Sequence, residues 1–111
     1  MTQTPDLNIP LSALVFDSDT HATATAADWD TTQIGVLLQH VVQRHAEGVL
    51  DQGNLHTVSV TFDVSADATA GTDVDFDSQI DRKTRTLIFA SGHARHEGKT
   101  LLRATIVFRI G

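Results

Sequence analysis

The chain has 111 residues, no cysteine and a formal charge of −6, which excludes disulfides, zinc–thiolate sites and a cysteine nucleophile and disfavours binding to nucleic acid. Its 41% of hydrophobic and 20% of charged residues are ordinary for one globular domain, which we expect to cover 1–111 with a loose arm at 1–10. The apolar runs are too short to span a bilayer and the N-terminus does not resemble a secretory signal. We therefore expect a cytoplasmic protein that does not bind membranes.

The first part of the chain predicts short extended segments. Residues 11–16 form a brief apolar run, and the Asp and Ser residues of 17–20 are typical of a turn. Residues 21–27 alternate between three alanines and polar residues, which is the period of a strand. Because alanine is small, this pattern indicates close packing against another element, for which the helix predicted next is the candidate.

One long helix is predicted over 32–49. Asp30, Thr31 or Thr32 can cap its start, and the Asp-Gln-Gly-Asn sequence at 51–54 ends it. Apolar residues recur with helical spacing and form a single stripe, together with one histidine. The stripe consists of Ile34, Leu37, Leu38, Val41, Val42, His45 and Val49.

The remainder predicts an antiparallel meander of strands. Residues 57–64, 74–80, 87–92 and 102–110 alternate in polarity or are apolar on both faces, and Glu97-Gly98-Lys99 between the last two is typical of a hairpin turn. Consecutive strands joined by short turns favour antiparallel pairing. We therefore expect an α+β fold in which an antiparallel sheet of five or more strands wraps one central helix.

This order of elements resembles the hotdog fold. The sequence RKTRTLIFASGHARHEGK at 82–99 is similar to a segment of the thioesterase superfamily that includes hydroxybenzoyl-CoA and phenylacetate-pathway thioesterases: a basic residue leads a strand of small and apolar residues that ends in a Gly-Lys turn. The closing ATIVFRI at 104–110 resembles the family's last strand. The resemblance covers about 20–110. It implies an acyl-CoA or similar thioester as substrate, hydrolysis as the reaction, and a homodimer or a dimer of dimers.

The segment that carries the family's site differs in this chain. Many members have His-Gly-Gly at the helix start, where this chain has Gln33-Ile34-Gly35, and an acid two turns into the helix, where it has Val42. Another branch has Asp-x-Asp followed by a glycine, which Asp28-Trp29-Asp30 with Gly35 resembles. The resemblance thus implies Asp30 as the general base or nucleophile, and Gly35 as the place where a thioester oxygen meets helical N–H groups.

Each of these two residues also has a purely structural interpretation. An aspartate before a helix needs only to cap it, because its side-chain oxygen accepts from a free backbone N–H. A glycine in a helix can serve close packing alone. The sequence leaves both alternatives open for Asp30 and Gly35.

Basic residues gather in the second half of the chain. Seven of the eight Lys and Arg residues lie from Arg82 onward, and Arg82, Lys83 and Arg85 form a cluster. In the family such residues meet the phosphates of coenzyme A, to which both side chains donate strong charge-assisted hydrogen bonds. The alternative is a solvated strand end.

The histidines point to structural roles. His45 on the apolar stripe is typical of a hydrogen-bonded core residue, and the spacing of His93 and His96 does not place both on one strand face. We therefore expect neither a metal nor another cofactor. Two rivals to thioester hydrolysis remain, a non-catalytic hotdog protein that binds an acyl-thioester or apolar ligand, and a structural subunit.

Overall fold

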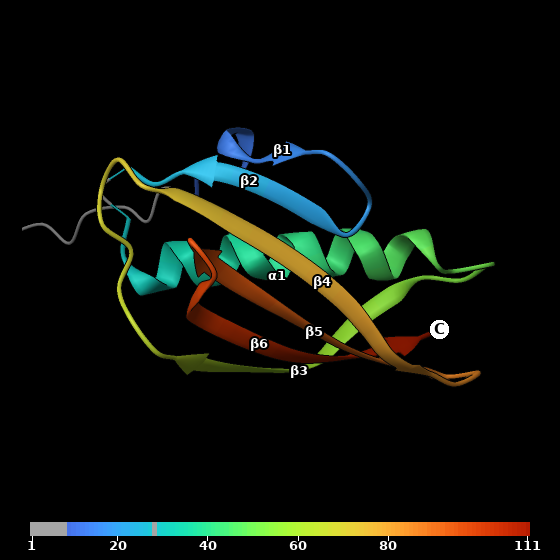
Figure 1. The fold of residues 1–111 in the computed structure, drawn as a ribbon. Helices are drawn as coiled ribbons and strands as arrows, with labels where there is room; N and C mark the ends of the chain where they lie inside the picture. The colour runs from blue at the N-terminus through green and yellow to red at the C-terminus, as the bar shows by residue number, and fades with distance from the viewer. Residues whose placement is uncertain (1–8, 28) are drawn as a thin grey trace, which may run out of the picture.

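The computed structural model describes residues 9–27 and 29–111; most of the predicted N-terminal arm, and Asp28, lie outside the described residues. One helix packs across a six-stranded antiparallel sheet (Figure 1), which confirms the predicted fold class. The elements in chain order are the 3₁₀ helix Leu11–Ala13, β1 Val15–Phe16, β2 His21–Thr25, α1 Thr31–Gly48, β3 Leu55–Val64, β4 Asp73–Lys83, β5 Leu87–His96 and β6 Lys99–Ile110.

The two ends of α1 are stabilised by side chains. At the start, Gln33 N–H donates to Asp30 Oδ1 (2.8 Å) and Asp30 N–H donates to Gln33 Oε1 (3.0 Å), which satisfies two amides that a helix start otherwise leaves unpaired. At the end, the Lys83 ammonium donates to the Val49 carbonyl (3.0 Å). No helix in the described part of the chain is long and apolar enough to cross a membrane.

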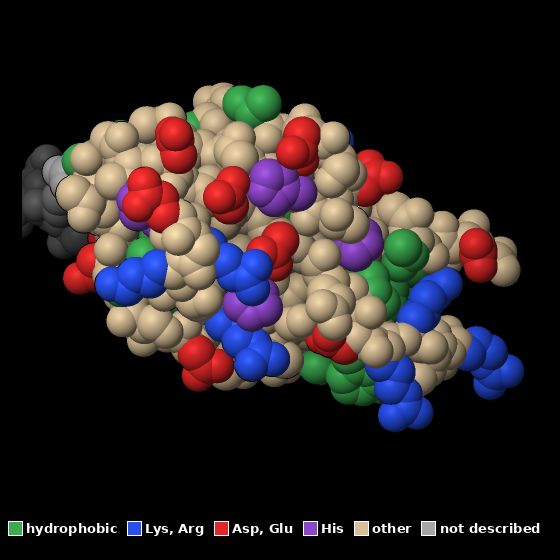
Figure 2. Space-filling view, in the orientation of Figure 1, with side chains coloured by type: hydrophobic (Ala, Val, Ile, Leu, Met, Phe, Trp, Pro, Cys, Tyr) green, Lys and Arg blue, Asp and Glu red, His purple; other side chains and the backbone are tan. Residues whose placement is uncertain are grey.

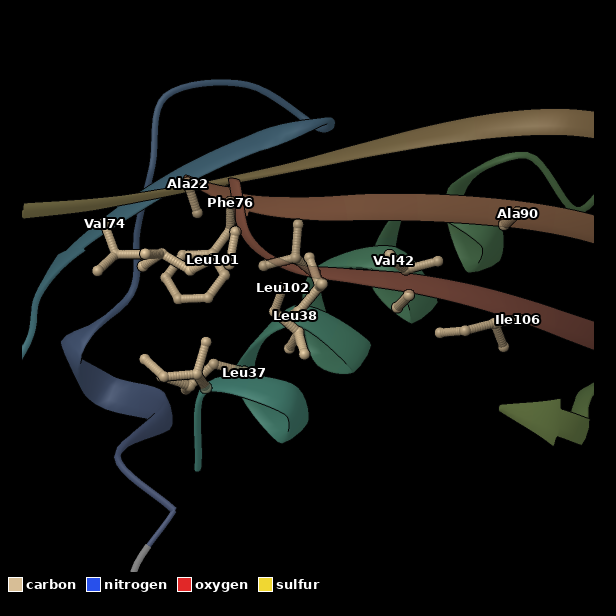
Figure 3. Close-up of a cluster of buried hydrophobic side chains, with 14 of the residues drawn as sticks. Ala22, Leu37, Leu38, Val42, Val74, Phe76, Ala90, Leu101, Leu102 and Ile106 are labelled. Carbon is tan, nitrogen blue, oxygen red and sulfur yellow. The ribbon is translucent and has the colours of Figure 1, made fainter. Parts of the chain in front are cut away.

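The core lies between α1 and the inner face of the sheet. Leu37, Leu38 and Val42 of the helix point toward Phe76 and other apolar side chains of the strands (Figure 3). The predicted stripe is confirmed, with His45 and Val49 half-buried at its end. Fully buried side chains of the core include Leu37, Leu38, Val41, Val42, Val74, Phe76, Ile88, Ile106 and Phe108.

The alanines of β2 belong to this core. Ala22, Ala24 and Ala26 are at most 5% exposed, and Ala22 stands directly opposite Phe76 in the β2–β4 ladder. A small side chain beside a large one lets the layers interdigitate at native density. The alternation over 21–27 therefore does mark a strand that packs closely.

The strand order is β1-β2-β4-β5-β6-β3, so β3 lies at one edge and pairs with β6. The predicted meander holds for β4, β5 and β6 and is wrong for β3, which does not pair with the strand that follows it. Residues 65–72 carry the chain across the sheet instead. Two amides of this connection, those of Ser65 and Ala66, donate to the Leu101 carbonyl (2.8 and 3.1 Å).

The β5–β6 hairpin turns where the sequence predicts it. Glu97 and Gly98 both have positive φ, 49° and 80°. Two consecutive residues of this conformation give a two-residue turn whose twist matches that of the flanking strands. The hairpin brings the start of β6 next to the end of β5.

Candidate active site

Asp30 is an exposed side chain at the N-terminal end of the central helix. Its Oδ1 accepts from Gln33 N–H, so the capping interpretation is confirmed. The cap leaves the carboxylate in contact with solvent. A catalytic role for Asp30 is compatible with this geometry and stays a prediction.

Gly35 lies buried in the second turn of α1. A Cβ built on it would stand 3.4 Å from Cε1 and Cζ of Phe62 and 3.7 Å from Cδ2 of Leu102. These are ordinary van der Waals distances, so the side chains of β3 and β6 pack on the helix here without requiring a glycine. Its predicted role in holding a thioester oxygen is not tested by this contact.

A second carboxylate lies at the helix start. Thr31 Oγ1 donates to Asp67 Oδ1 (3.3 Å), and Asp67 belongs to the connection from β3 to β4. The sequence analysis missed this residue, because nothing in the composition of 65–72 predicts that it returns to a helix start more than thirty positions earlier in the chain. The start of α1 thus presents Asp30 and Asp67 together.

The helix position at which the sequence resemblance implies an acid is occupied by a core residue. Val42 is fully buried, and one of its methyl groups lies 2.7 Å from where a Cβ on Gly92 would stand. No proton donor or acceptor side chain is present at this point of the helix. The carboxylates of α1 and its N-cap lie at its two ends instead: Asp30 at the start, and Glu47, which accepts from Gln43 Nε2 (3.0 Å), near the end.

The basic cluster lies at the opposite end of α1 (Figure 1). A helix of 18 residues spans about 27 Å, so the structure does not bring Arg82, Lys83 and Arg85 close to Asp30 within one chain. Lys83 is engaged with Val49 and lies 3.9 Å from an Asp51 oxygen.

Arg82 and Arg85 are exposed and form no ion pair with another described residue. Blue side chains project from this end of the molecule in Figure 2. A hollow of about 230 Å³ adjoins the cluster. It is lined by Leu50, Asp51, Gln52, Lys83, Thr84, Arg85 and Ile110.

The outer face of the sheet carries side chains of both charges and histidines (Figure 2). Asp77 accepts from Arg95 Nη1 (2.9 Å) and lies 3.3 Å from Nδ1 of His93. His96 lies 2.7 Å from the Asp73 carbonyl, so it does not share a carboxylate with His93. In the core, His45 Nδ1 lies 2.9 Å from Ser78 Oγ, as its hydrogen-bonded interpretation predicts. His93 and His96 therefore make structural contacts within the sheet, and His45 makes one between the helix and the sheet.

The protonation of His21 makes the stability of the fold depend on pH in a way that can be tested. Its Nδ1 lies 2.7 Å from Asp17 Oδ1 and its Nε2 lies 3.2 Å from Asp75 Oδ1. The hydrogen bond to Asp17, opposed by partial burial and aided by Asp75, raises the pKa of His21 above its ordinary 6.5. A raised pKa means that the protonated ring stabilises the fold below about pH 6.5, and that this stability is lost as the pH rises through the folded-state pKa.

We expect His21→Gln to remove that part of the pH dependence, a loss at low pH of about 0.2–1 kcal/mol as for partly exposed pairs. Urea unfolding of both proteins at about pH 6 and about pH 8.5 measures it. Equal destabilisation at the two pH values would contradict the assignment.

No family model matches the chain, and no curated protein matches it. Solved structures do. A phenylacetic acid degradation-related protein from Ralstonia eutropha JMP134 is 16% identical, with TM-score 0.74 and coverage of 94% of this chain and 92% of that one. A hypothetical thioesterase from Streptococcus pneumoniae TIGR4, solved with coenzyme A, is 10% identical, with TM-score 0.76 and coverage of 91% and 90%. Thioesterase superfamily member 2 from zebra fish is 13% identical, with TM-score 0.77 and coverage of 88% and 80%.

The chain has the hotdog fold. At these identities the likeness concerns the path of the backbone and assigns no residue a role. In this hotdog fold the ten-residue β3 is an unpaired edge, and Val58 and Val64 on it are 60% and 53% exposed. A long edge with exposed apolar side chains is a surface that another strand can cover.

Proposed function

We propose that this protein hydrolyses an acyl-CoA or a similar acyl thioester and works as a homodimer. The observation that supports this most is an exposed carboxylate, Asp30, at the start of the central helix of a hotdog fold. One hotdog structure similar to this chain holds coenzyme A. The proposal is tested first by assaying free thiol release from a broad panel of acyl-CoAs, and absence of turnover with every one would overturn it.

In the proposed reaction Asp30 acts as general base or as nucleophile. As a base it takes a proton from water, the water oxygen bonds to the thioester carbon, the carbon–sulfur bond breaks and the thiolate leaves and takes up a proton. The developing oxyanion needs donors at the same end of the helix. The first i→i−4 bond of α1 runs from Ile34 N–H to the Asp30 carbonyl (3.1 Å), so the amides of Thr31 and Thr32 precede the ladder. With Gly35 close by, they are the donors that suit this task.

A second copy of the chain completes the proposed site. Two β3 edges paired antiparallel about a two-fold axis would join the sheets and reverse the direction of the partner's helix. The basic end of one subunit then lies toward the Asp30 end of the other. In this arrangement Arg82, Lys83 and Arg85 hold the phosphates of a coenzyme A whose thioester is at Asp30 of the partner. Further association into a dimer of dimers belongs to the same proposal.

We expect a mass of at least two chains in solution. Pairing of β3 removes an exposed edge and covers Val58 and Val64. A strand that stays exposed to solvent would be expected to carry polar residues at these two positions. Light scattering or sedimentation at micromolar concentration measures the mass. A stable monomer that hydrolyses thioesters would contradict both the dimer and the shared site.

We expect Arg82→Ala and Arg85→Ala each to weaken coenzyme A binding several-fold at low salt, because exposed phosphate contacts contribute modestly and are screened by ions. Calorimetric titration at low and high salt measures this. Arg44→Ala is the control, since its guanidinium lies over the Phe16 ring, 3.8 Å from the centroid, away from the cluster. Equal affinities of the wild type, Arg82→Ala and Arg85→Ala at low salt would leave the cluster as solvated surface.

A non-catalytic hotdog protein that binds the thioester without turnover is the second candidate. The observation in its favour is that Val42 stands where many family members have an acid, while Asp30 also serves as a helix cap. The two functions differ in one measurement. If acyl-CoA binds and none is hydrolysed, the binding function replaces hydrolysis.

A further inference from the structure

The aromatic ring of Phe62 covers α1 at Gly35, in the turn that follows the proposed site at Asp30. Phe62 Cε1 and Cζ each lie 3.4 Å from the position of a Gly35 Cβ, so the ring stands over this part of the helix at van der Waals distance from that position. Phe62 pairs with Ala104 in the β3–β6 ladder, on the inner side of the edge strand. It is nevertheless 38% exposed. A ligand can therefore contact the ring, which is not part of the closed core.

The interior behind the ring is already filled. Leu37 and Leu38 are fully buried, and Leu102, which also contacts the Gly35 position, is 2% exposed. Several hollows lie away from Gly35. The hollow lined by Thr23 lies at β1–β2, and those lined by Lys83 and by Asn54 lie at the C-terminal end of α1. These core side chains leave no space further inside, so a chain of carbon atoms that extends inward from beside Gly35 meets the Phe62 ring.

We propose that Phe62 sets the upper size of the acyl group and restricts the enzyme to short acyl chains. The inference rests on the proposed thioester hydrolysis at the start of α1. With the carbonyl held near the first helical turn, the tail extends along the inner side of β3 and meets the ring. A longer tail must displace the ring, and the buried Leu102, which also borders the Gly35 position, limits its movement inward.

The test compares acetyl-, butyryl-, hexanoyl- and octanoyl-CoA as substrates of the wild type, Phe62→Ala and Phe62→Trp. We expect the ratio of kcat/KM for octanoyl-CoA to that for acetyl-CoA to rise about tenfold or more in Phe62→Ala, since each methylene accommodated in an apolar pocket changes discrimination by at least that order. Phe62→Trp should lower the ratio. Phe89→Ala is the matched control, because Phe89 stands between the inward-facing Ile88 and Ala90 and points to the outer face of the sheet.

The outcomes separate this inference from the proposed function. If the wild type hydrolyses none of the acyl-CoAs, the proposed function fails and the inference fails with it. If the wild type is active and neither Phe62 variant changes the ratio, the function stands and the size limit is wrong. Phe62→Trp keeps an aromatic side chain on the edge strand, so the inference is still tested if Phe62→Ala unfolds or dissociates, which thermal unfolding and light scattering report.

Discussion

Asp30→Asn should lower kcat/KM for the best acyl-CoA by about 100-fold or more, because loss of a general base or nucleophile costs at least this much. The substitution removes the carboxylate but keeps a capping side chain, so the effect on catalysis can be measured apart from the effect on the helix. Asparagine is as good an N-cap as aspartate, so the bond from Gln33 N–H is kept and the free energy of unfolding should change by less than about 0.5 kcal/mol. Steady-state kinetics and urea unfolding of the same preparation measure the two effects.

Two further variants complete the Asp30 experiment. Asp30→Ala removes both the carboxylate and the cap, so it should lose activity and also about 1 kcal/mol of stability. Asp67→Asn neutralises the neighbouring carboxylate that Thr31 contacts, and a small effect on kcat/KM would place the chemistry at Asp30 alone. Full activity of Asp30→Asn would show that the residue is only a cap, even if the protein is a thioesterase.

Gly92→Ala should destabilise the fold by about 2–3 kcal/mol, the upper range for an overpacked core. A Cβ at this position would lie 2.7 Å from the Asp77 carbonyl oxygen, 2.7 Å from a Val42 methyl and 2.9 Å from a Leu38 methyl. The two side chains can shift slightly, whereas the carbonyl belongs to β4, which pairs with β5 at Gly92. The midpoint of urea unfolding at one fixed protein concentration measures the loss.

The control makes the same substitution where there is space. Gly48 closes α1, and apart from its chain neighbours and the adjoining helix backbone no described atom lies within 4 Å of its Cβ position. Gly48→Ala should leave stability unchanged or raise it by up to about 1 kcal/mol, because alanine favours the helix. Similar midpoints for the Gly92 and Gly48 variants would mean that β5 does not approach the helix as closely as described.

Local patterns predicted most of the fold. The helical spacing from Ile34 to Val49 and the alternation in β6 depend on which side of an element is buried. The buried side can be predicted from the order of apolar and polar residues within the element itself. The partner of β3 was not predictable in this way. Its pairing with β6 depends on a connection, 65–72, whose path is set by contacts with Leu101 and Thr31 that no local period encodes.

The candidate site was predictable only residue by residue. The cap at Asp30 follows from residue type and position, and the structure confirms it. Two contacts of the site join residues that are far apart in the sequence: Phe62 lies beside Gly35, and Asp67 lies at the helix start. A single sequence does not reveal such contacts. The separation of Asp30 and Arg82 at opposite ends of α1 depends on the direction in which the helix crosses the sheet, which local sequence patterns do not encode.

The two edges of the sheet are unequal, and this limits how the protein can associate. β3 offers ten residues at one edge, whereas β1 offers two, Val15 and Phe16, at the other. A strand needs several consecutive backbone bonds to hold a neighbour, so of the two edges in the described part of the chain β3 is the one that suits extension of the sheet. In the proposed dimer, two chains joined through β3 would leave the two-residue β1 at each outer end of the described sheet. So short an edge would disfavour the addition of a third chain, and the same asymmetry that suits a closed pair would oppose open-ended fibre growth.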